Sequence, residues 1–177
     1  MKRFLPVLAL GALVAACVPP ATPPAPGGRT PLPQPASPRP RPAPAPAAQD
    51  WRDRPYTPGD WVYRQDARGS LALFGPPNRD ALLTLRCDRQ RGQMFLSRPG
   101  AAPAALVIRT TSLTRTLQAA PTGGEPPYVA AALLPRDPLL DAMAFSRGRI
   151  VVEVAGAAPL VVPNWAEIGR VVEDCRG

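Results

Sequence analysis

Proline spacing divides this chain into a stretch that cannot build a packed core and a stretch that can. Residues 18–50 hold 13 of the 27 prolines, several alternating with arginine or alanine, and almost no large apolar side chains. Such a stretch favours extended polyproline II and has too little apolar surface to bury. We therefore predict a Pro-rich, disordered linker over 17–50, spanning at most roughly 100 Å at ~3.1 Å per residue. One globular domain is predicted over 51–177.

The first sixteen residues have the layout of a signal peptide. Lys2 and Arg3 form a short positive segment, and the run Phe4–Ala16 that follows is apolar throughout. A membrane-spanning helix needs ~20 apolar residues, so this shorter run suits the leader of an exported protein better. A buried core helix is the alternative, but no polar residue interrupts the run to give it a second face. We expect residues 1–16 to direct export.

Val14-Ala15-Ala16-Cys17 resembles the lipobox of bacterial lipoproteins, in which small residues precede a cysteine that becomes the mature N-terminus. The resemblance implies a diacylglycerol on the Cys17 thiol and a further acyl chain, such as palmitate, on its amine. Two or more acyl chains give stable membrane anchoring. Val18, where inner-membrane lipoproteins usually carry Asp, favours the outer membrane by the same resemblance. We expect a lipid-anchored protein of the cell outer membrane that faces the periplasm; the alternative is an ordinary signal peptide and an incidental Cys17.

If Cys17 is acylated, two of the three cysteines remain. In the oxidising compartment that export implies, Cys87 and Cys175 are expected to form a disulfide bond, and two buried free thiols are the alternative. The chain has no histidine, and two cysteines so far apart do not make a ligand cluster. We expect no metal site and no cofactor.

The formal charge of +8 is spread along the chain. Residues 51–177 hold 16 arginines and 12 acidic residues, so the folded part is only about +4. A nucleic-acid-binding protein gathers its basic residues on one face, whereas these are interleaved with Asp and Glu. We expect no nucleic-acid partner, although a mildly cationic surface is attracted to anionic lipid headgroups or wall polymers.

Most of residues 51–177 carries the short alternating or apolar runs of β-strands. The runs lie at 61–63, 70–74, 81–87, 93–98, 105–111, 114–119, 128–134, 149–154 and 160–162. Residues 81–87 and 93–98, joined by a short polar turn, are typical of a hairpin. The pattern predicts an α+β fold built on a mostly antiparallel β sheet or sandwich.

Two segments break this β pattern and predict helices. Asp137 followed by Pro138 is typical of a helix start, so we expect a short helix near 138–146. Asn164 with Glu167 three residues later resembles a capping box, which starts a C-terminal helix near 165–175. Trp165, Ile168, Val171, Val172 and Cys175 would share its inward face, and Cys175 would join that helix to the strand ending at Cys87.

The stretches A-F-S-R-G-R-I (144–150) and P-N-W-A-E-I-G-R-V-V-E-D-C-R-G (163–177) resemble a family of exported lipoproteins of Gram-negative bacteria without an assigned activity. The layout of strands, a late L-L-D-A-M helix and a cysteine-bearing terminal helix is also similar to periplasmic β-sandwiches of the invasion-associated locus B type. Neither resemblance implies a reaction.

Ser146, Arg147 and Arg149 are candidate contacts for an anion or a partner, because two guanidinium groups flank the flexible Gly148. The alternative interpretation is a helix C-terminus with basic residues and a glycine cap, which local structure alone explains. For the other candidates, too, both a functional and a purely structural role are open. Glu167 suits a cap, and Glu173 and Asp174 suit a solvated helix face, although carboxylates also serve acid–base chemistry. Three tryptophans suit either a sugar-binding groove or structural anchors: Trp51, Trp61 and Trp165.

The sequence contains no established catalytic motif, since G-x-S-x-G, S-x-x-K and a Gly-rich phosphate loop are all missing. The leading hypothesis is therefore a non-catalytic binding or assembly module that contacts another envelope protein or the cell wall. An inhibitor or accessory factor of an envelope enzyme or secretion machine is the alternative. A hydrolase of wall glycans that uses two carboxylates is a third possibility.

Overall fold

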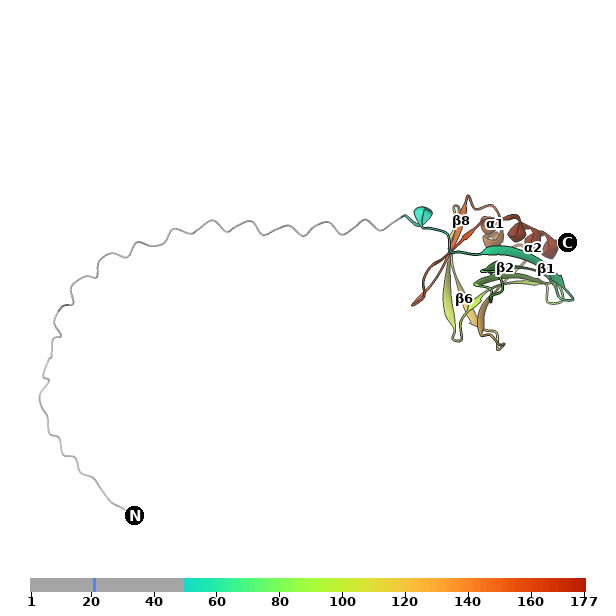
Figure 1. Ribbon diagram of the computed structural model, residues 1–177, viewed down its shortest axis with the longest axis horizontal. Coiled ribbons are helices and arrows are strands. Elements are labelled where there is room, and N and C mark those ends of the chain that lie inside the picture. Colours follow the sequence, from blue (N-terminus) through green and yellow to red (C-terminus); the bar gives the residue numbers. More distant parts are fainter. Residues whose placement is uncertain (1–20, 22–49) are drawn as a thin grey trace, which may run out of the picture. The chain divides into compact units, whose positions relative to one another are not determined.

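The computed structural model describes Ala21 and residues 50–177 (Figure 1). The predictions for the signal peptide, for Cys17 and for the body of the linker lie outside these residues. The described part contains a short 3₁₀ helix, nine strands and two α-helices, in this order: η1 (Trp51–Asp53), β1 (Asp60–Asp66), β2 (Gly69–Gly75), β3 (Leu83–Asp88), β4 (Gln93–Pro99), β5 (Ala104–Arg109), β6 (Thr114–Pro121), β7 (Tyr128–Leu133), α1 (Pro138–Ala144), β8 (Arg149–Val154), β9 (Leu160–Pro163) and α2 (Ala166–Arg176).

The strands form one antiparallel sheet in the order β1-β2-β3-β4-β7-β6-β5-β8-β9. The predicted hairpin is present as β3 and β4, in which Cys87 lies opposite Met94. Strand β7 lies between β6, which precedes it in the chain, and β4, so β4 is not paired with β5, the next strand in the chain. The expected α+β class, with a mostly antiparallel sheet, a short middle helix and a C-terminal helix, is confirmed.

The sheet has a first half, β1-β2-β3-β4-β7, and a second half, β6-β5-β8-β9, which join at the end of β6. Strand β6 pairs with β5 along Thr114–Ala119, but it pairs with β7 only through Ala120 and Pro121. Beyond the two edge strands, the segment leading into β1 lies beside β9. There Thr57 N–H donates to Val161 O at 2.8 Å, and Val161 N–H donates back to Thr57 Oγ1 at 3.0 Å. The segment before β1, at one edge of the sheet, is therefore hydrogen-bonded to β9, at the other edge.

Trp61 reinforces this closure from β1. Its indole N–H donates to Pro163 O at the end of β9, at 2.8 Å, and its ring lies 5.3 Å from that of Phe74, centroid to centroid. Only 5% of Trp61 is exposed. Of the two interpretations of this residue, the structural anchor is the one observed.

Both helices contribute to the core, which the two halves of the sheet share. Helix α1 begins as predicted, because the Asp137 side chain accepts a hydrogen bond from Leu139 N–H and Pro138 opens the first turn. Helix α2 lies against strands β1 to β4 and against α1. Its buried residues are Ile168, Val171 and Val172.

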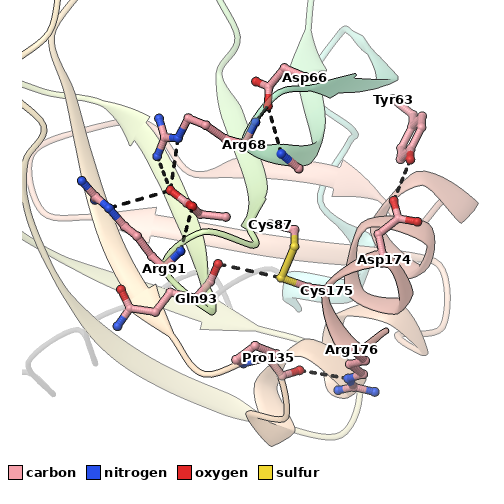
Figure 2. The surroundings of a disulfide bond; sticks show 12 residues. Tyr63, Asp66, Arg68, Cys87, Arg91, Gln93, Pro135, Asp174, Cys175 and Arg176 are labelled. Atoms are coloured by element: carbon pink, nitrogen blue, oxygen red, sulfur yellow. Dashed lines mark hydrogen bonds and ion pairs between the residues drawn. A yellow bond between two sulfur atoms is a disulfide. The ribbon is translucent and has the colours of Figure 1, made fainter.

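The disulfide predicted between Cys87 and Cys175 is present and joins β3 to α2 (Figure 2). The Cys87 side chain is fully buried, because it lies on the face of β3 that also carries Leu83 and Leu85. The disulfide therefore connects the last turn of the C-terminal helix to the middle of the first half of the sheet.

The predicted start of α2 is wrong in its details. The residue before the first turn is Trp165, whose side chain makes no capping hydrogen bond, and Trp165 is 44% exposed and does not face inward. Asn164 donates through Nδ2 to Ala144 O and Ser146 O, at 3.0 and 2.6 Å. Its amide thus serves a tertiary contact with the end of α1 instead of the helix start.

Candidate functional site

A hollowed surface lies on the face of the first half of the sheet that points away from the core. Strands alternate their side chains, so burial of Trp61, Phe74 and Leu85 on one face directs Val62, Leu73 and Arg86 to the other. Two adjoining hollows of about 550 and 480 Å³ lie there and share four lining residues: Thr84, Arg86, Ser97 and Thr122. We refer to the two together as the outer trough.

The outer trough combines an apolar lining with positive charge. Its apolar side chains come from β1, β2 and β4: Val62, Leu71, Leu73 and Phe95. Its charged lining residues are five arginines and two aspartates: Arg64, Arg68, Arg79, Arg86, Arg91, Asp60 and Asp80. Three of the arginines, Arg68, Arg86 and Arg91, pair with Asp66 or Asp88. The guanidinium groups of Arg64 and Arg79 form no ion pair within the described residues and favour an anionic ligand.

Two loops border one end of the outer trough. The segment 76–81 follows β2, and 122–127 leads into β7, which begins at Tyr128. Tyr128 connects them, because its hydroxyl donates to Ala81 O at 2.5 Å. Burial, with a contribution from the charge of Asp80, raises the pKa of Tyr128, so the phenol remains a hydrogen-bond donor at neutral pH.

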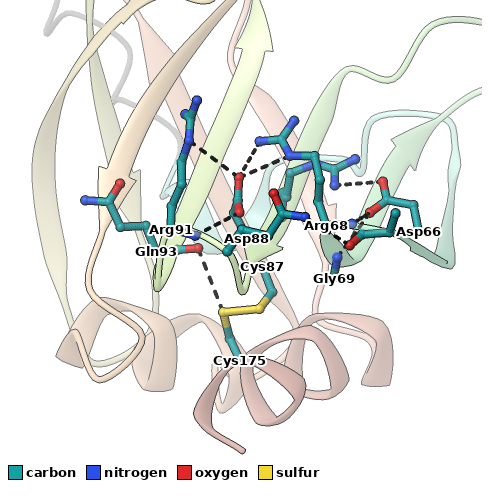
Figure 3. A network of polar contacts seen from close by, with 11 residues as sticks. Asp66, Arg68, Gly69, Cys87, Asp88, Arg91, Gln93 and Cys175 are labelled. Carbon is teal, nitrogen blue, oxygen red and sulfur yellow. Dashed lines mark hydrogen bonds and ion pairs between the residues drawn. A yellow bond between two sulfur atoms is a disulfide. The ribbon is translucent and has the colours of Figure 1, made fainter.

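The arginines at the other end are positioned by two aspartates (Figure 3). Asp88, which is 1% exposed, accepts from both Nε and Nη2 of Arg68 and from the backbone N–H of Arg91. Asp66 accepts from the N–H groups of Arg68 and Gly69 and forms an ion pair with Arg86 at 2.8 Å. The guanidinium groups are therefore held on the surface of the sheet.

Gly69 is required in this network by its backbone. Its φ is +146°, and a Cβ atom there would lie 2.4 Å from the carbonyl oxygen of Cys87. A side chain would push β2 away from β3 beside the two aspartates.

The hydrogen bond from Arg68 holds the pKa of Asp88 below its usual value, and the close guanidinium of Arg86 does the same for Asp66. On the second half of the sheet, Arg54 and then Arg109 lower the pKa of Glu153. These carboxyls bind protons more weakly in the folded chain than in the unfolded chain. Their stabilisation is complete above the unfolded pKa and is lost as the pH falls through the folded one.

We therefore expect the free energy of unfolding to be nearly constant from about pH 5.5 to 8, since the chain has no histidine, and to fall below about pH 5. Urea unfolding across this range measures it. Asp88→Asn should be less stable than wild type at pH 7, and the difference should shrink in acid. Glu173→Gln, an exposed control on α2, should follow the wild-type curve. An Asp88→Asn curve parallel to wild type at every pH would contradict the assignment.

The candidate contacts Ser146, Arg147 and Arg149 lie outside the outer trough. Ser146 and Arg147 are in the turn between α1 and β8, and Arg149 is the first residue of β8. Ser146 is 3% exposed; its hydroxyl donates to Arg149 O and accepts from Thr111 N–H. Arg149 donates to Arg54 O at 2.5 Å. Ser146 and Arg149 are thus held by contacts within the protein, whereas Arg147 is exposed.

The glycine-cap interpretation of this turn is wrong. Helix α1 ends at Ala144 with Phe145 as its C-cap, and its last turn contains no basic residue. Gly148, with φ of +89°, lies farther along, where the chain turns into β8. Its carbonyl accepts from the Tyr56 hydroxyl at 3.1 Å and from Asn164 N–H at 3.1 Å.

The other candidates are dispersed. Asp174 is half-buried, and the Tyr63 hydroxyl donates a hydrogen bond to it at 2.6 Å. Burial raises its pKa, but hydrogen bonding, chiefly from Tyr63, leaves the pKa lowered overall. Glu167 lies in the first turn of α2, and Glu173 is exposed. The three tryptophans occupy η1, β1 and the start of α2, and none lines the outer trough.

Sequence reasoning missed the outer trough. The available signal was the polar half of the strand alternation, such as Arg64 in β1, Arg86 in β3 and Ser97 in β4. That alternation marks a solvated face but does not indicate which strands are neighbours.

Comparison of the chain with models of protein families, with curated proteins and with solved structures gave no match. Within the described residues, no set of three or more His, Cys, Asp or Glu side chains is placed to hold a metal ion. In the same part of the chain, no helix combines the length and apolar character needed to cross a membrane.

Proposed function

We propose that this chain is an envelope lipoprotein, anchored through acylated Cys17, whose folded domain is a non-catalytic binding module. The outer trough binds an extended acidic segment of an envelope protein. The observation that carries the proposal is the combination of an apolar lining with five arginines, on strands β1 to β4 and the turns that join them.

The shape of the trough suits an extended chain. Val62 and Leu73 lie opposite each other on β1 and β2, and Thr84 and Ser97 continue the same row across β3 and β4. The next row contains Arg64, Leu71, Arg86 and Phe95. A segment lying across the strands would place apolar side chains on Val62 and Leu73 of the first row and carboxylates beside the arginines of the second.

The arginines are arranged for binding anions. Asp66 and Asp88 are acceptors in ion pairs with lowered pKa values, so they remain charged and keep Arg68 and Arg86 in position. Arg64 and Arg79 form no ion pair within the described part of the chain, and both are exposed. They are therefore free to pair with carboxylates of a ligand.

A direct test uses fluorescence anisotropy with a labelled peptide that alternates Glu and Val, and a twin in which Lys replaces Glu. Wild type should bind the acidic peptide and not its basic twin, with an affinity that falls as salt rises. Arg64→Glu with Arg79→Glu should weaken binding by about tenfold or more.

The matched control is Arg89→Glu with Arg136→Glu, which changes the net charge equally at exposed positions outside the outer trough. Equal loss of affinity in both double variants would show nonspecific attraction and refute the assignment. Mass spectrometry of the mature protein tests the anchor separately, since an N-terminus without acylated Cys17 would contradict it.

A further inference from the structure

Three exposed aromatic residues lie in or beside the turn between α1 and β8. Phe145 is 79% exposed, Trp165 is 44% exposed and Tyr56 is 44% exposed. They come from three distant parts of the chain: the end of α1, the start of α2 and the segment before β1. Together with Arg147 from the turn and Arg149 at the start of β8, we call this surface the aromatic patch.

Hydrogen bonds keep the members of the patch together. Asn164, next to Trp165, donates from Nδ2 to the carbonyls on either side of Phe145. The Tyr56 hydroxyl and the Asn164 N–H donate to the same acceptor, Gly148 O. The backbone of the patch is therefore held by hydrogen bonds, and binding costs little further conformational entropy.

The charge of the patch is positive and is not cancelled by carboxylates. The Arg149 guanidinium stacks over the Tyr56 ring, 4.6 Å from its centroid, and donates to a backbone carbonyl. Arg147 is exposed, and neither arginine forms an ion pair within the described residues. Aromatic side chains next to arginines are typical of membrane–water interfaces. There the rings lie at headgroup level and the guanidinium groups contact phosphates.

The patch also lies where the described chain begins. Arg54, immediately after η1, contacts both Arg149 and Glu153 of β8, and Figure 1 shows η1 beside β8. The last turn of α2, with Arg176, lies instead beside Pro135 and Asp141. The aromatic patch is therefore on the side of the domain where the described chain enters it.

We infer that the aromatic patch docks the folded domain onto an anionic phospholipid surface, with Phe145 and Trp165 inserted at headgroup level and Arg147 on lipid phosphates. The binding does not depend on the proposed anchor, and it makes no use of the outer trough. The domain then has two contact surfaces, one for the bilayer and one for an acidic partner segment.

Cosedimentation with vesicles tests this inference on the full chain carrying Cys17→Ser, so that no acyl chain contributes. The Cys17→Ser chain with an unchanged patch should bind vesicles of phosphatidylglycerol and phosphatidylethanolamine. It should bind phosphatidylcholine vesicles much less. Phe145→Ala with Trp165→Ala should lower the partition coefficient about tenfold or more. Arg147→Glu should weaken binding to the anionic vesicles only.

Leu134→Ala is the matched control, because Leu134 is 68% exposed and lies near the other end of α2, next to Pro135. It should bind like wild type. Vesicles containing brominated lipid should quench part of the tryptophan fluorescence, and Trp165→Phe should remove that quenching. The patch substitutions are at exposed positions, so thermal unfolding should show an unchanged fold.

Absence of vesicle binding, or equal loss in Leu134→Ala and the patch variant, would overturn the inference. Unchanged vesicle binding in the patch variant, together with loss of a crosslink from position 145 to an envelope protein, would assign the surface to a protein instead. The acidic-peptide assay on the same variants reports the outer trough separately and should be unaffected by Phe145→Ala with Trp165→Ala.

Discussion

Removal of the Cys87–Cys175 disulfide is expected to lower the free energy of unfolding by about 4–5 kcal/mol, the largest loss for any single covalent feature of this domain. The two residues are separated by 88 positions, so the bond closes a long loop and restricts the unfolded chain strongly. It also holds the last turn of α2 against β3, where Cys87 is fully buried (Figure 2).

Urea unfolding of the Cys17→Ser chain measures this loss, with and without dithiothreitol. The reductant should lower the unfolding midpoint of the Cys17→Ser chain strongly. With Cys87→Ala and Cys175→Ala added, the midpoint should already be low without reductant and should not change when reductant is added. Helix α2 should still form in the variant, because Ile168, Val171 and Val172 remain buried. A midpoint that does not respond to reductant in the Cys17→Ser chain would contradict the prediction.

Trp61→Ala is expected to cost about 3–5 kcal/mol, because it leaves a large cavity between β1 and Phe74 and removes a contact to β9. Trp61→Phe retains most of the apolar volume but loses the indole hydrogen bond to Pro163 O. It should cost less, on the order of 1–2 kcal/mol. Thermal and urea unfolding of both variants give the two values.

Trp165→Ala is the control for Trp61, because the same change at a 44% exposed tryptophan should alter stability by only about 0.5 kcal/mol. Hydrogen exchange adds a more specific readout. In Trp61→Ala, amides at the meeting of the sheet edges, such as Thr57 and Val161, should exchange faster than those of the β3–β4 hairpin. Equal acceleration throughout the sheet would show that Trp61 does not act at this closure.

The positions of the strands and helices could be predicted because each has a local cause. Alternation of apolar and polar residues specifies a half-buried strand, as in Leu83–Asp88, whose Leu83, Leu85 and Cys87 are buried. Asp137 followed by Pro138 specifies a helix start, since the carboxylate accepts from an N–H group that the first turn leaves unpaired.

The errors occur where a tertiary contact competes with a local one. Asn164 is suitable as a cap by residue type, but the carbonyls of Ala144 and Ser146 lie within reach of its amide and take both hydrogen bonds. Trp165 is suitable for the inward face of α2 by spacing, but it lies before the first turn and is partly exposed. Local patterns contain no information about such distant acceptors.

The candidate sites show the same limit more strongly. Leu71, Arg86 and Phe95 become neighbours only because β2, β3 and β4 pair in one register, and Tyr128 joins them because β7 is inserted beside β4. The aromatic patch likewise requires three segments to meet around Gly148.

By itself, the sequence determined the α+β class, the extent of most strands and helices, and the cysteine pair, because periodicity, helix-start residues and the number of cysteines are local or compositional. Only the tertiary structure decided the strand order, the meeting of the sheet edges at Trp61 and Pro163, and the two surfaces proposed to bind partners. The physical reason is that these features depend on which strands lie side by side, and side-chain alternation specifies the face of a strand without specifying its neighbour.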